Sequence, residues 1–141
     1  MILCLIFYSL AISQESCILS PKRSFSIQKL DGTIKPVKIP ISDLGRTYRE
    51  FQGQYIETTG IIGGGFEEFA IYPDTILFIG KSYGFWLEIN PELNFDHYSF
   101  KKIDGKRVRI KGIIDTTKTG HLGSYLATID SIYFWAEQEH Q

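Results

Sequence analysis

The chain of 141 residues is long enough for one domain with a single modest hydrophobic core. Hydrophobic residues make up 43% of it and charged residues 22%, which excludes an intrinsically disordered chain. Its formal net charge of -1 excludes a whole-protein field that would attract nucleic acid or an anionic membrane.

The first residues, MILCLIFYSLAIS (1–13), are uncharged and almost wholly apolar. Such a run is too short for an ordinary transmembrane helix and is typical of the apolar part of a secretory signal peptide. Ala11 and Ser13 supply the small residues of a cleavage site after Ser13, although no lysine or arginine precedes the apolar run. We expect a signal peptide over residues 1–13 and an extracytoplasmic protein, periplasmic or secreted. The alternative is a buried apolar N-terminal strand or helix.

Cleavage after Ser13 would remove Cys4 and leave Cys17 as the remaining thiol. A single thiol cannot form an internal disulfide, so Cys17 is free, pairs between chains or carries lipid. Of the three residues before it, only Ser16 fits the small residues that precede a lipidated cysteine. A free cysteine is the simpler interpretation, and membrane attachment is expected only if Cys17 is lipidated.

Residues 14–49 form an N-terminal extension that is partly strand-like. Asp31-Gly32 predicts a hairpin turn between the arms SFSIQKL (24–30) and TIKPVKI (33–39). The extension is interpreted as a leader to the main domain and not as a domain of its own.

Prolines and a serine shape the second half of this extension. Pro36 and Pro40 confine the second arm to an edge strand or an extended tether, because proline cannot donate a ladder hydrogen bond. Ser42 is the expected N-cap of a short helix over residues 43–51, which Gly45 weakens.

Residues 50–136 show the pattern of a five-stranded domain, followed by a tail of residues 137–141. A helical or irregular link of residues 91–104 separates the third strand from the fourth. The expected strands are GQYIETTGIIGG (53–64), FEEFAIYP (66–73), YGFWLEIN (83–90), KRVRIKGIID (106–115) and SYLATIDSIYF (124–134).

Five strands with a helix-sized insertion after the third resemble the OB-fold, a five-stranded, partly open Greek-key barrel. The resemblance rests on YIETTGII, GFWLEI and GKRVRIKGIID, with Gly60 and Gly112 where strands must bend to close the sheet. The ending GHLGSYLATIDSIYF is similar to small exported bacterial proteins that have an OB-fold and no assigned function. The resemblance implies an all-β fold with a small helical insertion and an N-terminal extension.

The turn TTKTGHLGSY (116–125) is one of the two loops that border OB-fold binding sites. We expect Trp86 to offer a stacking surface at the open mouth of the barrel, with His121, Tyr125 and Lys118 as polar contacts. The alternative is structural, because a lone histidine in a hairpin commonly bonds a backbone carbonyl and fixes the turn.

The fourth strand carries a local excess of positive charge. Residues 101–118 contain seven basic and two acidic residues, a local net charge of +5. Strand alternation places Val108 and Ile110 on the core side and the cations Arg107, Arg109 and Lys111 on the outer side. The simplest interpretation is the solvated face of an amphipathic strand.

The alternative function is single-stranded nucleic acid binding, with these three cations on phosphates and Trp86 stacking on a base. Two observations disfavour it. Expected export separates the protein from most nucleic acid. The strands that OB-folds usually present to oligonucleotides, the second and the third, carry Glu67, Glu68 and Glu88.

No catalytic motif, metal site or cofactor site is predicted. The three histidines, His97, His121 and His140, lack the spacing of metal ligands, and no Gly-x-Ser-x-Gly motif occurs. The three glutamates could converge for acid–base chemistry or to hold a cation, but solvated strand faces carry such residues routinely. We therefore expect a non-enzymatic, exported OB-fold module of the bacterial envelope that binds a protein, a glycan or a small molecule.

Overall fold

The computed structural model describes residues 23–65, 67–73, 83–95 and 100–139. The predicted signal peptide, Cys17, His97 and His140 lie outside the described residues. Within the described residues, no helix is long and apolar enough to cross a membrane.

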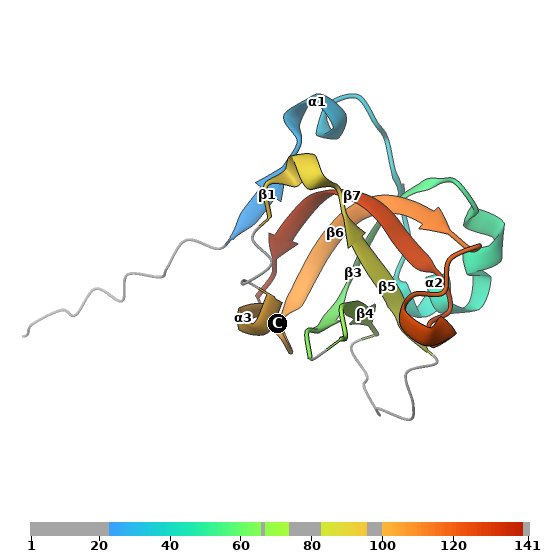
Figure 1. The fold of residues 1–141 in the computed structure, drawn as a ribbon. Helices are drawn as coiled ribbons and strands as arrows, with labels where there is room; N and C mark the ends of the chain where they lie inside the picture. The colour runs from blue at the N-terminus through green and yellow to red at the C-terminus, as the bar shows by residue number, and fades with distance from the viewer. Residues whose placement is uncertain (1–22, 66, 74–82, 96–99, 140–141) are drawn as a thin grey trace, which may run out of the picture.

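Five strands close into a barrel whose strands curve around one core (Figure 1). Around the barrel the order is β3, β4, β5, β7 and β6, and β6 pairs again with β3. β5 and β7 run parallel, and the other four pairs are antiparallel. This confirms the predicted all-β, five-stranded Greek-key barrel of the OB type. The barrel strands are β3 (Tyr55–Gly63), β4 (Ala70–Tyr72), β5 (Phe85–Ile89), β6 (Arg107–Asp115) and β7 (Thr128–Glu137).

The last strand differs from its expected limits. It begins at Thr128, because the preceding residues form a loop in which Tyr125 N–H donates to the Thr119 carbonyl. It continues to Glu137, where the N–H donates to the Arg23 carbonyl. The final residues of the barrel therefore pair with the N-terminal extension.

The predicted hairpin at Asp31-Gly32 is wrong. The extension forms β1 (Ser24–Ser26), the one-turn helix α1 (Gln28–Asp31) and β2 (Val37–Lys38), and its two arms do not pair with each other. β1 pairs with β7 beyond the part that β5 covers, and β2 pairs with β3 before the part that β4 covers. Each arm thus supplies hydrogen-bond partners to a strand edge that the short strands β4 and β5 leave open. Pairing with these edges stabilises the fold more than a local hairpin at Asp31-Gly32 would.

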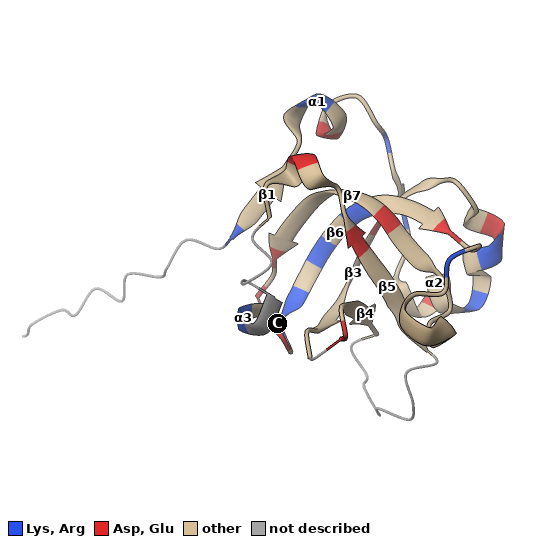
Figure 2. Cartoon of the chain, viewed as in Figure 1, with Lys and Arg blue, Asp and Glu red and all other residues tan. Residues whose placement is uncertain are grey.

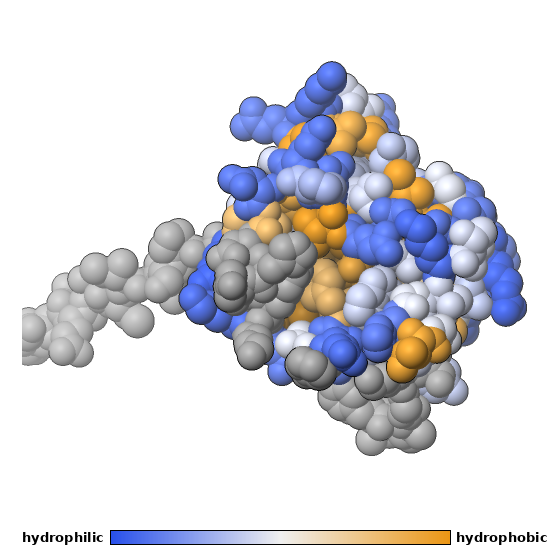
Figure 3. Space-filling view, viewed as in Figure 1, coloured by the Kyte–Doolittle hydropathy of each residue, from blue (hydrophilic) through white to orange (hydrophobic). Residues whose placement is uncertain are grey.

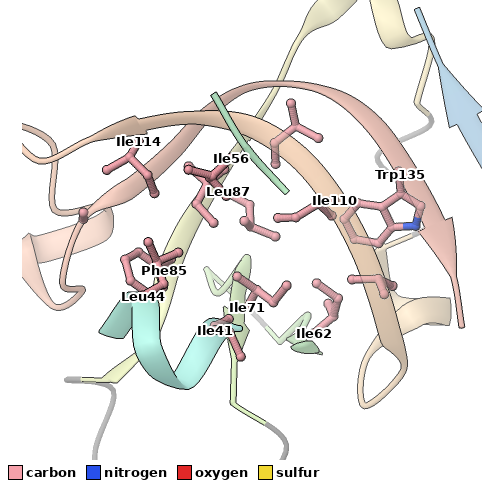
Figure 4. Packing of buried hydrophobic residues seen from close by; sticks show 14 of the residues in the cluster. Ile41, Leu44, Ile56, Ile62, Ile71, Phe85, Leu87, Ile110, Ile114 and Trp135 are labelled. Carbon is pink, nitrogen blue, oxygen red and sulfur yellow. The ribbon is translucent and has the colours of Figure 1, made fainter. Parts of the chain in front are cut away.

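A short helix closes one end of the barrel (Figure 4). It is α2 (Ile41–Thr47), followed by the 3-10 helix η1 (Tyr48–Phe51). The predicted N-cap Ser42 is wrong, because the helix begins two residues earlier, at Ile41, and Pro40 is its N-cap. The Pro40 carbonyl accepts from the N–H groups of Asp43 and Leu44. This start turns Ile41 and Leu44 toward the core.

The link between β5 and β6 contains the 3-10 helix η3 (Pro91–Leu93) and the one-turn helix α3 (Phe100–Ile103). This is the small helical insertion that the sequence predicts. Leu93 and Ile103 from the two turns are buried in the barrel core. The insertion therefore closes part of the core as well as connecting two strands.

The core is built from the inward faces of all five barrel strands together with α2. Trp135 is its largest fully buried side chain. Gly60 is required there, because a Cβ at this position would lie 2.4 Å from the Tyr72 carbonyl oxygen. Gly112 lies at the register shift between β6 and β7, where a Cβ would come within 2.9 Å of the Asp130 carbonyl oxygen. Both predicted bending positions are thus positions of close backbone approach.

Candidate binding face on strands β4 and β5

Trp86 lies on the outer side of β5 because Phe85 and Leu87 point into the core. Its indole ring is partly exposed and packs between two side chains of the loop that joins β6 to β7. The ring centroids of Trp86 and Tyr125 are 5.2 Å apart, and those of Trp86 and His121 are 6.5 Å apart with the planes nearly parallel. Three of the four predicted ligand-binding residues therefore come together, and we call Trp86, His121, Tyr125 and Tyr72 the aromatic face.

His121 connects the two loops that flank this face. Its Nε2 lies 3.4 Å from a carboxylate oxygen of Glu67, which belongs to the loop between β3 and β4. The His121 side chain is 42% exposed and that of Glu67 is 59% exposed, so both remain accessible to a ligand. Leu122, beside His121, is 86% exposed. Figure 3 shows hydrophobic surface at the position of this loop.

Beneath Trp86 lies a pair of buried tyrosines. Tyr72 is 4% exposed and Tyr125 is 5% exposed. The Tyr72 hydroxyl donates to the carboxylate of Glu68. Burial first, and the hydrogen bond to Glu68 second, raise the pKa of Tyr72 far above its usual range. Burial and the negative charge of Glu68 also raise the pKa of Tyr125. These hydroxyls form a buried polar floor beneath Trp86.

Glycines let the aromatic rings approach the backbone. A Cβ at Gly84 would lie 2.5 Å from the Tyr72 ring, and one at Gly63 would lie 2.8 Å from the other side of it. A Cβ at Gly120 would lie 2.6 Å from Trp86 Cβ, and the backbone there has a φ of +65°. The face is therefore packed and pre-formed, with its ring positions set by glycine on three segments.

Lys118, the fourth predicted ligand-binding residue, is held in an ion-pair cluster. Its ammonium lies 2.7 Å from Asp130, 3.0 Å from Glu88 and 4.0 Å from Asp115. Hydrogen bonds from Lys118 to Asp130 and then to Glu88 raise the pKa of the ammonium. A hydrogen bond from the Thr117 hydroxyl lowers the pKa of Asp115. Lys118 thus fixes the loop to β5 and β7.

The alternation predicted for β6 is confirmed, since Val108 and Ile110 are fully buried and the cations point away from the core. Figure 2 shows these basic positions as blue bands along β6. Lys111 is only 15% exposed, donates to Asp31 and lies 4.5 Å above the centre of the Phe134 ring. The N-terminal extension therefore covers part of this row of cations.

The structure does not bring Trp86 and these cations together. Along β7, Trp86 is in register with Thr128, whereas Arg109 is in register with Ala136. Eight residues of strand at about 3.3 Å each put these two points roughly 26 Å apart along β7. A base stacked on Trp86 would thus lie far from phosphates held by Arg109.

The three glutamates of the second and third strands each have a different partner. Glu67 lies beside His121, Glu68 accepts from Tyr72, and Glu88 pairs with Lys118. In the described part of the chain, no group of three or more histidine, cysteine, aspartate or glutamate side chains could hold a metal ion. Arg107, the remaining predicted nucleic-acid contact, lines a separate cavity beside β2.

Two features of the aromatic face were not predicted from the sequence. Tyr72 ends a short strand and gives no sign that its hydroxyl is buried, since that depends on Gly63 and Gly84 closing around its ring. Leu122 adopts a left-handed backbone with a φ of +55°, which a leucine rarely does. The glycines on either side of His121-Leu122 were the one available signal of an unusual turn.

A scan against protein-family models found no match, and a search of curated proteins found no similar sequence.

Proposed function

We propose that the protein is a non-enzymatic, exported OB-fold binding module of the bacterial envelope, and that its aromatic face binds an uncharged glycan. The observation that carries the proposal is the partly exposed Trp86 ring, bordered by the accessible pair His121 and Glu67. OB-folds bind oligosaccharides and oligonucleotides on this part of the barrel, between the same two loops.

The chemistry of the face favours a sugar. A ligand site combines an apolar surface with a few fixed polar groups, and an indole ring offers such a surface to the C–H side of a sugar ring. His121 and Glu67 can exchange hydrogen bonds with hydroxyl groups at its edge. The buried Tyr72 and Tyr125 hold the floor rigid, which reduces the entropy lost on binding.

The charge of the face disfavours phosphates. Glu67 and Glu68 lie on one side of Trp86, and the carboxylates around Lys118 outnumber its single positive charge. Binding of single-stranded nucleic acid would instead use Arg107, Arg109 and Lys111 on β6, away from Trp86. Export is supported by the apolar run of residues 1–13 and would bring the module to the glycans of the envelope.

The ligand test is a binding screen of the protein against a glycan array and against single-stranded oligonucleotides. We expect an uncharged glycan to bind with little dependence on salt, and Trp86→Ala to weaken binding at least tenfold, by about 1.4 kcal/mol for one lost stacking contact. His121→Ala should weaken it less, because that side chain supplies one polar contact. The control is Tyr83→Ala, an exposed aromatic residue just before β5.

Oligonucleotide binding that falls steeply with salt and is lost in Arg109→Gln, with no glycan bound, would replace the proposal with the nucleic acid alternative. The location is tested separately by the intact mass of the protein from fractionated cells. A chain that begins at Gln14, or one lipidated at Cys17, would support export, whereas an uncleaved cytoplasmic chain would contradict it.

A further inference from the structure

A second concave site lies at a break in the barrel wall beside β3. On the side of β3 that faces away from β6, β2 pairs opposite Ile56 and Glu57, and β4 pairs opposite Ile61–Gly63. Among the described strands, none is in register with residues 58–60 on this side. The wall is therefore interrupted between β2 and β4, close to the start of α2.

A cavity of about 560 Å³ opens at this break. Its lining comes from β2, the start of α2, β3, the residue after β4 and the first residue of β6. Small-molecule sites commonly enclose roughly 300–1,000 Å³, so the volume suits a ligand of that size. No residue of the aromatic face lines this cavity, so the two are separate.

The charges on the lining favour an anion. Lys38 from β2 and Arg107 from β6 both line the cavity, and Lys38 forms no ion pair with another described residue. A guanidinium fork matches the two oxygens of a carboxylate or phosphate group. Glu57 also lines the cavity and lies 3.9 Å from the ammonium of Lys111, which it shares with Asp31, so the two cations of the lining face one carboxylate.

A buried hydroxyl supplies a second and independent observation. Thr58 is 2% exposed and lines the cavity, and its Oγ1 has no hydrogen-bond partner in the described part of the chain. Buried polar groups are nearly always hydrogen-bonded, so this unpartnered hydroxyl, which is closed to solvent, would gain a partner if the cavity wall shifts to admit a ligand oxygen. The hydroxyls of Ser42 and Thr59 lie on the same lining.

We infer that this cavity is a second ligand site, which takes a small molecule carrying a carboxylate or phosphate group. Lys38 and Arg107 bind the oxyanion, and Thr58, Ser42 and Thr59 contact its oxygens or neighbouring hydroxyl groups. The inference does not depend on the glycan proposal, because the residues of the two sites do not overlap.

The experiment follows backbone amide resonances of the full chain by NMR during titration with glucuronic acid, with glucose 6-phosphate and with uncharged glucose. We expect an acidic sugar to shift the amides of residues 38, 39, 41, 42 and 57–59 at millimolar concentration, and glucose to leave them in place. The acid that acts at the lower concentration tells whether the site prefers carboxylate or phosphate.

Two variants test the residues. Lys38→Gln should raise the Kd about tenfold through loss of a charge-assisted contact, whereas Lys35→Gln, an exposed lysine outside the lining, should leave it unchanged. Thr58→Val keeps the shape of the side chain and should weaken binding several-fold without lowering the Tm of the free protein. A purely structural Thr58 would leave the Kd unchanged.

The inference is overturned if neither acid shifts these amides, or if Lys38→Gln and Lys35→Gln change the Kd equally. Shifts confined to residues around Trp86 would also overturn it while supporting the aromatic face as the binding site. If no glycan binds in the screen but an acidic sugar shifts these amides, the inference about the cavity stands and the glycan proposal fails.

Discussion

Two outer faces of the same barrel differ in whether another segment of the chain covers them. On β5 the outward residues Trp86 and Glu88 stay partly exposed between two loops. On β6 and β7 the outward side chains Lys111 and Tyr133 lie under the N-terminal extension. In Figure 1 β1 of this extension, in blue, lies beside the C-terminal part of β7.

The difference follows from strand length. β7 is ten residues long and β5 only five, so β5 leaves the second half of β7 without a neighbour on that side. β1 fills this edge, and the chain that follows packs Ile27, Leu30 and Ile34 against Tyr133 and Phe134. The outer side of β7 is therefore covered where this strand extends beyond β5, because β1 pairs with the open edge and the following residues pack on the outward side chains.

Removing the cover should have the largest effect. A chain that begins at Ile39 loses β1, α1 and β2, and with them the burial of Ile27, Leu30 and Ile34. We expect a loss of at least about 3 kcal/mol in the free energy of unfolding, about 1 kcal/mol for each partly buried side chain. Urea denaturation measures it. A chain that begins at Arg23 retains all of these contacts and is the control, and equal midpoints for the two chains would contradict the covering role.

On the open face, the largest single-residue effect is expected at Gly120. An alanine there must adopt a left-handed φ and meets Trp86 Cβ at 2.6 Å, so Gly120→Ala should cost about 3 kcal/mol, from backbone strain and overpacking. Gly123 has a similar φ of +67° but its Cβ would meet only the Thr119 hydroxyl at 3.6 Å. Gly123→Ala should therefore cost about 1 kcal/mol from strain alone.

Thermal unfolding of the two variants measures this difference. Equal destabilisation would mean that the β6–β7 loop shifts to make room for the added methyl group and that Trp86 is not held by close packing. In that case the aromatic face would not be pre-formed, and its affinity for a ligand would be lower than a rigid face provides.

The smallest expected effect is an alkaline pH dependence shared by the two faces, since burial also raises the pKa of Tyr133, on the covered face, to about 12. The pKa values of Tyr72 and Tyr125 are raised in the folded state, first by burial. Unfolded tyrosines lose their protons near pH 10 while the folded ones keep them. The stabilisation is therefore complete below about pH 10 and is lost as the pH rises further.

Urea denaturation at pH 8, 10 and 11 measures this slope. Tyr72→Phe should flatten it, because the largest contributor can no longer ionise. Tyr83→Phe, at a tyrosine that is 66% exposed, is the control for the removal of one phenol. An unchanged slope in Tyr72→Phe would show that alkaline unfolding begins elsewhere in the molecule.

One sequence signal for the covered face was present and was not used. Ile132, Tyr133, Phe134, Trp135 and Ala136 form an uninterrupted apolar run within β7. A strand with one solvated face alternates, whereas a strand buried on both faces is continuously apolar. The run therefore predicts that some segment covers the outer side of β7, although it does not identify the segment.

The candidate sites were harder to predict from the sequence than the fold. Trp86 was placed on the correct side of its strand by period-2 alternation, and His121 was placed beside it by the position of its loop in a five-stranded barrel. The pairing of Lys118 with Glu88 could not be predicted, since it depends on the parallel alignment of β5 and β7. The cavity beside Thr58 could not be predicted either. It arises because β2 and β4 pair with different parts of β3 and leave residues 58–60 between them.

By itself, the sequence determined the number and order of the barrel strands, the inward side of β5 and β6, and the glycines at which strands bend. These are local properties, because side-chain alternation and the steric freedom of glycine act within a few residues. Only the tertiary structure decided which edges the N-terminal extension covers, which rings stack on Trp86, and where the barrel wall is open. Those outcomes depend on contacts between residues far apart in the chain, whose partners are set by strand register and by the need to satisfy every exposed edge.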